Sequence, residues 1–417
     1  MNARMWRRGL VAAVVATTIA GGTATAAADE GQLLTGDDPA HAAAQPGDVA
    51  AAGTMVPMPD LAIAHRLPGG GMNLWRMPLS ELETGYGQPE LVKTLNYGGF
   101  SYDNSRTIAG DFGDITPSDD GTADHIIWHA QPNGGVLLWA VGGGADTTPR
   151  LWQDLRTGGW SWANSRPAAA DVNGDGWDDL VVLHRIAGTI TDNVWVFLSD
   201  GQQFAAPRLW DRLGAYTGGR RFLLSDLDGD GYSNVISIDL MGPPWAQELD
   251  YSATDPKGGG AHPIWGGFQG TTELFTGNAS AGWSFAASRQ LVGDVTGDGW
   301  DDLVTVHQQP NGGILVWVHP NCGYGFACVQ APVVWQDLRS GGWSFAGSRQ
   351  YLADTNGDGR EDLISVHQQS GNPGELIWRH LSTGAGFSTP QVIADLRTGG
   401  WTYAASRDGV ADLYGEI

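Results

Sequence analysis

The sequence is poor in lysine, in cysteine and in long apolar stretches. Of its 417 residues only Lys93 and Lys257 are lysines, and Asp and Glu outnumber Lys and Arg 46 to 23, which gives a formal net charge of −23. Because such an acidic chain repels the phosphate backbone, nucleic acid is not an expected partner. Two cysteines are too few for a disulfide scaffold. The 62 Gly and 19 Trp favour short strands joined by tight turns over an all-α protein.

The common catalytic signatures are also missing. The sequence contains no Gly-x-Ser-x-Gly, no His-Glu-x-x-His, no phosphate-binding loop and no Rossmann fingerprint, and it lacks Arg-Gly-Asp. Hydrophobic residues make up 41% of the chain, which is too rich for a disordered protein. A folded binding protein is therefore a better expectation than an enzyme.

Residues 1–28 have the features of a secretory signal peptide. A basic start is followed by an apolar stretch from Leu10 to Ala20 and then by small residues. A membrane anchor is the alternative, but this run is short for a span. No later stretch reaches 18 apolar residues, so we expect a secreted protein without a membrane span. Residues 29–54 are expected to form a flexible leader, which leaves 55–417 as the folded domain.

The two cysteines, Cys322 and Cys328, lie six positions apart. After export, an even pair this close is expected to oxidise to a disulfide that closes a local hairpin loop. A reactive or metal-binding dithiol is the alternative, and secretion argues against it.

Self-similarity is the dominant feature of the chain. Segments that begin at Trp160, Trp283 and Trp343 share Trp-Ser-aromatic-Ala-x-Ser-Arg, followed by an Asp/Gly-rich loop and an apolar run that ends in His. With three weaker copies, the first aspartate of each loop falls at 111, 171, 226, 294, 354 and 412. An arginine stands five residues before each of them: Arg106, Arg166, Arg221, Arg289, Arg349 and Arg407. The chain therefore contains six copies of a unit of about 60 residues.

Each unit has the periodicity of strands. Short apolar, β-branched runs are separated by Gly, Asn and Asp clusters, and four such runs per unit are typical of one propeller blade. The segment from Met58 to His65 matches the late part of the repeat, and the segment from Trp401 to Ile417 matches the early part. We therefore predict an all-β, six-bladed β-propeller of four-stranded blades, closed by pairing both ends of the chain in one blade. An open solenoid and a seven-bladed ring are the alternatives.

The Asp/Gly-rich loops have the pattern Asp-x-Asn/Thr/Asp-Gly-Asp-Gly-x-x-Asp. Oxygens at positions one, three, five and nine, with a backbone carbonyl at position seven, are suited to one hard cation, and Ca²⁺ fits better than Mg²⁺. About four Ca²⁺ sites are expected, and the alternative is that these are only Asp/Gly turns. The predicted metal residues are Asp171, Asn173, Asp175, Trp177 and Asp179; Asp226, Asp228, Asp230, Tyr232 and Asn234; Asp294, Thr296, Asp298, Trp300 and Asp302; and Asp354, Asn356, Asp358, Arg360 and Asp362.

Two further copies of the loop are incomplete. The first copy is stretched, with Asp111, Asp120 and Asp124, and binding there stays open. The last is divided between the two ends of the chain, with Asp412 and Glu416 on one side and Asp60 on the other, and weak or no binding is expected.

The segments 285–303 and 345–363, with aromatic-Ala-x-Ser followed by Asp-x-Asn/Thr-Gly-Asp-Gly-x-x-Asp-Leu, resemble FG-GAP/VCBS repeats. The resemblance covers roughly 55–417 and implies a β-propeller with Ca²⁺ in the blade loops, as in integrin α-subunit heads. The chain differs from that family in the Arg after Ser, in the His after the strand, and in six rather than seven expected blades. The family includes adhesion proteins, lectins and polysaccharide-active enzymes, so it does not decide the function.

The repeated aromatic, arginine and histidine residues allow two interpretations. Blade-to-blade packing with Arg over an aromatic face is one, and a multivalent sugar-binding pocket between blades is the other. The candidate ligand-binding residues are Trp160, Arg166, Trp283, Arg289, Trp343, Arg349, Trp401 and Arg407. A histidine follows the strand in five units, at His65, His129, His184, His307 and His367. We expect a structural role for it, with a ring of titratable groups lining the central channel as the alternative.

The irregular stretch 240–282 belongs to the longest unit and is the best place for a unique site. No catalytic residue is assigned. Together these patterns favour a secreted, monomeric, Ca²⁺-binding propeller that acts as a binding module for carbohydrate or for a cell-surface protein or glycan. An extracellular polysaccharide lyase or hydrolase on a propeller scaffold and a purely structural repeat domain are the alternatives.

Overall fold

The computed structural model describes residues 56–57, 59–79, 87–113, 124–144, 146–189, 191–213, 220–226, 232–239, 248–252, 285–321, 330–411 and 414–415. The predicted signal peptide and leader, both cysteines and most of the stretch 240–282 lie outside these residues. Within them, regular structure is β apart from two single-turn 3-10 segments, η3 (Phe285–Ala287) and η4 (Tyr403–Ala405). In this part of the chain no helix is long and apolar enough to cross a membrane.

In the part of the chain that the structure describes, the strands form five four-stranded antiparallel sheets, one three-stranded sheet and one two-stranded pair. One four-stranded sheet is β24 (Ser406–Ala411), β2 (Asp60–Arg66), β3 (Met72–Pro78) and β4 (Glu90–Leu95). The next two are β5 (Ser105–Gly110), β6 (Asp124–Ala130), β7 (Val136–Val141) and β8 (Arg150–Leu155), and β9 (Ser165–Ala170), β10 (Asp179–Arg185), β11 (Asp192–Phe197) and β12 (Arg208–Leu213). The last two are β16 (Ser288–Gly293), β17 (Asp302–Gln308), β18 (Ile314–His319) and β19 (Val333–Leu338), and β20 (Ser348–Ala353), β21 (Asp362–Gln368), β22 (Glu375–His380) and β23 (Gln391–Leu396).

The three-stranded sheet consists of β13 (Arg220–Ser225), β14 (Asn234–Asp239) and β15 (Glu248–Ser252). A short pair, β1 (Val56–Pro57) with β25 (Tyr414–Gly415), joins segments near the two ends of the chain.

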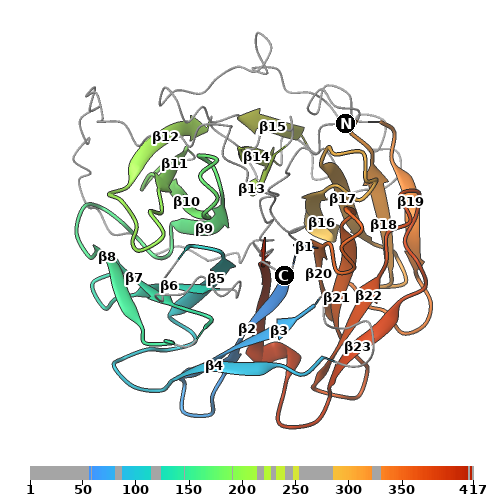
Figure 1. The fold of residues 1–417 in the computed structure, drawn as a ribbon, viewed down its shortest axis with the longest axis horizontal. Helices are drawn as coiled ribbons and strands as arrows, with labels where there is room; N and C mark the ends of the chain where they lie inside the picture. Colours follow the sequence, from blue (N-terminus) through green and yellow to red (C-terminus); the bar gives the residue numbers. More distant parts are fainter. Residues whose placement is uncertain are drawn as a thin grey trace.

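The sheets are arranged as the blades of a β-propeller. The first strand of each, β24, β5, β9, β13, β16 and β20, lies toward the centre, and β4, β8, β12, β19 and β23 lie at the rim (Figure 1). Each central strand contacts the central strands on both sides, in the order β24, β5, β9, β13, β16, β20 and back to β24. The predicted all-β propeller is therefore present, with five complete blades and the three-stranded sheet between β9 and β16.

One blade is assembled from both ends of the chain. Strand β24 pairs antiparallel with β2 from Asp60↔Ala411 to His65↔Ser406. This pairing confirms the prediction that the terminal segments share a blade, and it covers the edge that β2 would otherwise present.

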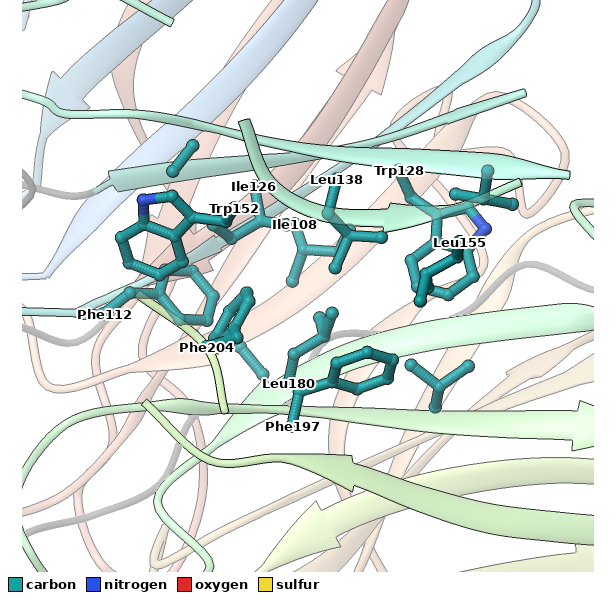
Figure 2. Packing of buried hydrophobic residues seen from close by; sticks show 14 residues of the cluster. Ile108, Phe112, Ile126, Trp128, Leu138, Trp152, Leu155, Leu180, Phe197 and Phe204 are labelled. Atoms are coloured by element: carbon teal, nitrogen blue, oxygen red, sulfur yellow. The ribbon is translucent and has the colours of Figure 1, made fainter. Parts of the chain in front are cut away.

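The core consists of layers between neighbouring blades. In Figure 2, Ile108, Ile126, Trp128 and Leu138 of one blade face Leu180, Phe197 and Phe204 of the next. Because each blade is covered on both faces, the second strand of a blade is apolar almost throughout, as in the buried run Leu180–Leu183 that follows Asp179 in β10.

Phe197 provides a direct test of this layer. Its side chain is fully buried and meets Trp128 edge to face, with ring centroids 6.4 Å apart. Phe197→Ala is expected to lower the free energy of unfolding by about 3–5 kcal/mol in urea denaturation, because it leaves a cavity between two blades. Leu151→Ala on the rim strand β8 is the matched comparison, since Leu151 is 47% exposed and its truncation should change little. Equal effects of the two substitutions would contradict the packing described here.

A repeated bulge was not visible in the sequence. In all five four-stranded blades the register between the third and fourth strands shifts at the residue before a tryptophan. These tryptophans are Trp75, Trp139, Trp195, Trp317 and Trp378. A bulge increases the local twist of a strand, which helps each rim strand follow the turn of its blade.

Candidate functional sites

The Asp/Gly-rich loops join the first and second strands of their blades and close on themselves through the aspartate at position one. Asp171 accepts the N–H groups of Gly174 at 2.7 Å and Gly176 at 2.9 Å. Asp294 and Asp354 make the same pair of bonds at 2.6–2.8 Å in their own loops. Gly174 and Gly176 have φ of 73° and 98°, which only glycine adopts readily, so the sequence pattern determines the turn.

The aspartate at position nine is fully buried in each complete loop and ties the loop to the other hairpin of its blade. Asp179, Asp302 and Asp362 accept the N–H groups of Ser199, Asn321 and Ser382 at 2.7–2.8 Å. Burial raises the pKa of Asp302 to about 7 and that of Asp362 to about 6, and the neighbouring loop carboxylates add to the effect. The ionised form of these carboxylates is thus disfavoured, and a bound cation would relieve that cost.

The donors in these loops are oxygens only, which suits a hard cation such as Ca²⁺. Among the described residues, however, no group of three or more His, Cys, Asp or Glu side chains is arranged to hold a metal ion. In the fourth loop Asp226 and Asn234 are buried, whereas Asp228 and Asp230 lie outside the described residues. The same is true of Asp120, Asp412 and Glu416 in the two incomplete loops. Calcium binding therefore stays a prediction.

Loops of neighbouring blades are linked to one another. The N–H of position eight donates to the carbonyl of position one in the preceding blade, from Ser233 to Asp171 at 2.8 Å and from Glu361 to Asp294 at 2.9 Å. The Asp178 N–H makes the same bond to Asp111. These bonds join each of these loops directly to the loop of the next blade.

The repeated arginines connect the blades. Arg106 lies 4.0 Å above the centre of the Trp162 ring, which belongs to the start of the next blade, and donates to the carbonyls of Trp162 and Ser165. Three other junctions repeat this stacking at 4.0–4.1 Å: Arg289 over Phe345, Arg349 over Tyr403 and Arg407 over Tyr102. The aromatic partner is thus two residues after the repeated aromatic position, which is Phe100 in one blade and Trp in the others, and it lies in the following blade, where sequence reasoning had not placed it.

The repeated tryptophans pack on residues of the adjoining strands instead. Trp343 lies against His367 and Trp378, with ring centroids 4.7 Å and 5.2 Å apart. Trp160 and Trp401 are packed in the same way, and Trp283 lies outside the described residues. Arg166 donates to the Arg220 carbonyl at 2.6 Å and pairs with Asp192 at 3.0 Å. These contacts favour the packing interpretation, and a ligand-binding role for these residues stays a prediction.

The repeated histidines have structural partners. His129 and His184 each share a 2.9 Å hydrogen bond with a buried serine, Ser105 and Ser165. Each serine hydroxyl also donates to the carbonyl four residues earlier, at 2.7 Å. Burial lowers the pKa of both histidines. The expected structural role fits these contacts better than a titratable channel lining.

One pocket interrupts the repetition. It has a volume of about 470 Å³ and lies between β4 and the loop that joins β7 to β8 of the next blade. Its lining consists of Arg76, Glu90, Leu91, Val92, Gly143, Gly144 and Thr147. Arg76 binds a single oxygen of Glu90 through Nε at 3.0 Å and Nη2 at 2.8 Å, and the Leu91 side chain is 50% exposed.

Sequence reasoning missed this pocket because its residues depart from the repeat. The pair Arg76↔Glu90 corresponds to Ala140↔Arg150 in the next blade and to Val318↔Val333 in another. The signal in the sequence was an oppositely charged pair, Arg76 and Glu90, at a position where the other blades cited have no ion pair. It could be recognised only after the strands had been aligned with their partners.

No protein-family model and no curated protein matches the sequence. Among solved structures, the chain is similar to that of a triple arginine-to-alanine mutant of AofleA from Arthrobotrys oligospora. The identity is 11%, the TM-score is 0.43, and the match covers 84% of this chain and 89% of that one. At this level of similarity neither a residue role nor a function transfers from that protein.

Proposed function

We propose that the protein is a secreted, Ca²⁺-binding, six-bladed β-propeller of the FG-GAP/VCBS type that acts as a carbohydrate-binding module. The sixth blade would be the sheet β13–β15. The closed circle of contacts among six central strands supports this count.

The observation that carries the binding function is the pocket at Arg76 and Glu90. A guanidinium and a carboxylate held against each other offer donors and an acceptor side by side, which suits neighbouring sugar hydroxyls. The exposed Leu91 side chain offers an apolar surface for the C–H face of a sugar, and Gly143 and Gly144 leave their backbone accessible. A pocket between two blades was the predicted place for a sugar, although the residues differ from those predicted.

A glycan array followed by calorimetry on the best ligand tests this function. Arg76→Gln and Glu90→Gln should each weaken binding by about tenfold or more, since each removes a charged hydrogen-bonding partner. Arg339→Gln should leave affinity unchanged, because Arg339 forms an exposed ion pair with Asp337 on another blade. Unchanged affinity in both pocket variants would refute the assignment of the pocket. Release of shortened or unsaturated products would favour the polysaccharide-active enzyme, and absence of any bound glycan would favour the structural domain.

Calcium binding is tested separately by thermal unfolding in Ca²⁺ and in EDTA. Each site is expected to contribute about 3 kcal/mol when Ca²⁺ is present at about 100 times its dissociation constant, so EDTA should lower the melting temperature by several degrees. Asp298→Ala at position five should reduce the melting temperature in Ca²⁺ and much less in EDTA. Asp337→Ala, which removes an exposed aspartate outside the loops, should behave alike in both buffers. An identical melting temperature with and without EDTA would refute the calcium proposal.

A further inference from the structure

Six arginines occupy the same register position on the central strands. Each is the second residue of its strand, and each central strand contacts its two neighbours around the centre of the propeller (Figure 1). They are Arg407, Arg106, Arg166, Arg221, Arg289 and Arg349, in their order around the centre. In a protein of net charge −23, this is a concentration of positive charge around the axis.

Carboxylates accompany only part of this set. Arg349 pairs with Asp408 at 2.6 Å and Glu375 at 3.2 Å, and Arg166 pairs with Asp192 at 3.0 Å. Arg106 and Arg407, on the touching strands β5 and β24, bind neutral groups instead. Each uses Nη1 alone for two backbone carbonyls of the following blade, and each stacks on an aromatic ring.

The other edge of these two guanidinium groups is available. Nε and Nη2 of Arg106 and Arg407 have no acceptor among the described residues. Both arginine side chains are half-buried, so each keeps part of its surface in contact with solvent. Nε–H and Nη2–H point from the same edge of the guanidinium plane and form the fork that binds oxyanions in a bidentate manner.

The Arg407 guanidinium lies beside the start of β5, because its Nη1 donates to the carbonyl of Ser105, the residue before Arg106. The pKa of Arg106 is lowered to about 10, first by burial and then by the positive charges of Arg407 and Arg166. The aromatic stacking and the carbonyl bonds hold each guanidinium in place, so the fork is oriented before a ligand arrives. A bound anion would relieve the repulsion between the two charges.

We propose that Arg106 and Arg407 form a binding site for a tetrahedral oxyanion, a sulfate or phosphate group, near the propeller axis. The group would be free in solution or carried as an ester on a sugar. The site is separate from the pocket at Arg76 and does not depend on the proposed carbohydrate function or on calcium.

Calorimetry with sodium sulfate measures the site directly. Chloride at equal ionic strength corrects for screening, and binding is measured rather than melting temperature because sulfate stabilises proteins nonspecifically. We expect a dissociation constant of about 1 mM or tighter. Galactose 6-sulfate, compared with galactose and with free sulfate, distinguishes the two sources of the group: tighter binding of the ester indicates a sugar-borne anion, and equal binding indicates the free anion. Absence of sulfate, phosphate and ester binding at millimolar concentrations would overturn the proposal.

Two further measurements locate the anion. Arg106→Gln and Arg407→Gln should weaken sulfate binding by about tenfold, whereas Arg339→Gln should not. Because both arginines also link blades, a variant that fails to fold is replaced by phenylglyoxal modification of the wild-type chain, mapped by mass spectrometry. Sulfate should protect Arg106 and Arg407 and leave Arg339 reactive. Equal modification of all three with and without sulfate would refute the assignment.

Discussion

A chain that ends at Ala405 is expected to lose the cooperative folding of the whole propeller. The deletion removes β24, the central strand of the blade that begins with β2, and exposes the edge of β2. It also removes the buried Val410, the Arg407 stack on Tyr102 and the 2.6 Å ion pair of Asp408 with Arg349. Because Arg349 belongs to β20 and Tyr102 precedes β5, contacts on both sides of the blade are lost together.

Circular dichroism melting and size-exclusion chromatography measure this effect. The truncated chain should aggregate or melt without a sharp transition, while a chain that ends at Ala411 should keep the wild-type transition because it retains all of β24. A synthetic peptide of residues 406–417 added to the chain ending at Ala405 should restore a sharp transition. A normal melting curve for the shorter chain alone would show that the ring does not depend on closure by β24.

His380→Leu is expected to stabilise the protein by an amount that grows as the pH falls. The His380 side chain is fully buried, and neither ring nitrogen has a hydrogen-bond partner among the described residues. Burial lowers the pKa of His380 to about 3. Below the unfolded-state pKa of about 6.5, the unfolded chain takes up a proton that the folded chain does not, so the wild type loses stability as the pH falls toward 3. The leucine variant lacks this loss.

Urea denaturation at pH 7.5 and pH 4.5 gives the size of the effect. The advantage of the variant should increase by about 3 kcal/mol between these two values, since about two pH units separate 6.5 from 4.5. The buried loop carboxylates have raised pKa values and act in the opposite direction, but they are common to both proteins and cancel in the difference. His129→Leu provides the contrast, because it breaks the 2.9 Å bond to Ser105 and should destabilise at pH 7.5. A pH-independent difference between His380→Leu and the wild type would contradict the argument.

Much of the fold could be predicted because its signals are local and repeated. Gly and Asp at set loop positions determine turns such as the one at Asp171, and the apolar runs between loops predict strands that need cover on both faces. Complementary terminal motifs predicted the pairing of β24 with β2, since only joining the ends completes the last unit. These features depend on neighbours a few residues apart, or on comparison of one copy with another.

The partners of side chains between blades depended on the tertiary structure. The repeat placed an aromatic residue and an arginine six positions apart, at Trp160 and Arg166, and this proximity in sequence suggested a shared pocket. In the folded protein Arg106 reaches Trp162 because a blade's central strand faces the start of the next blade, 56 residues later. Whether two residues so far apart in sequence come into contact depends on how the two sheets pack. No local sequence pattern specifies that packing.

The amino-acid sequence was thus sufficient for the blade, its Asp/Gly loops and the closure of the ring, because repetition reports the same local geometry several times. Only the packing of the blades into a ring decided which polar groups are paired between blades and which face solvent. Arg349 is neutralised by Asp408 and Glu375, whereas Arg106 and Arg407 bind neutral carbonyls through Nη1, although all three occupy the same place in the repeat. The pocket at Arg76 and Glu90 likewise depends on a loop of the adjacent blade, so a departure from the repeat became a site only when two blades met.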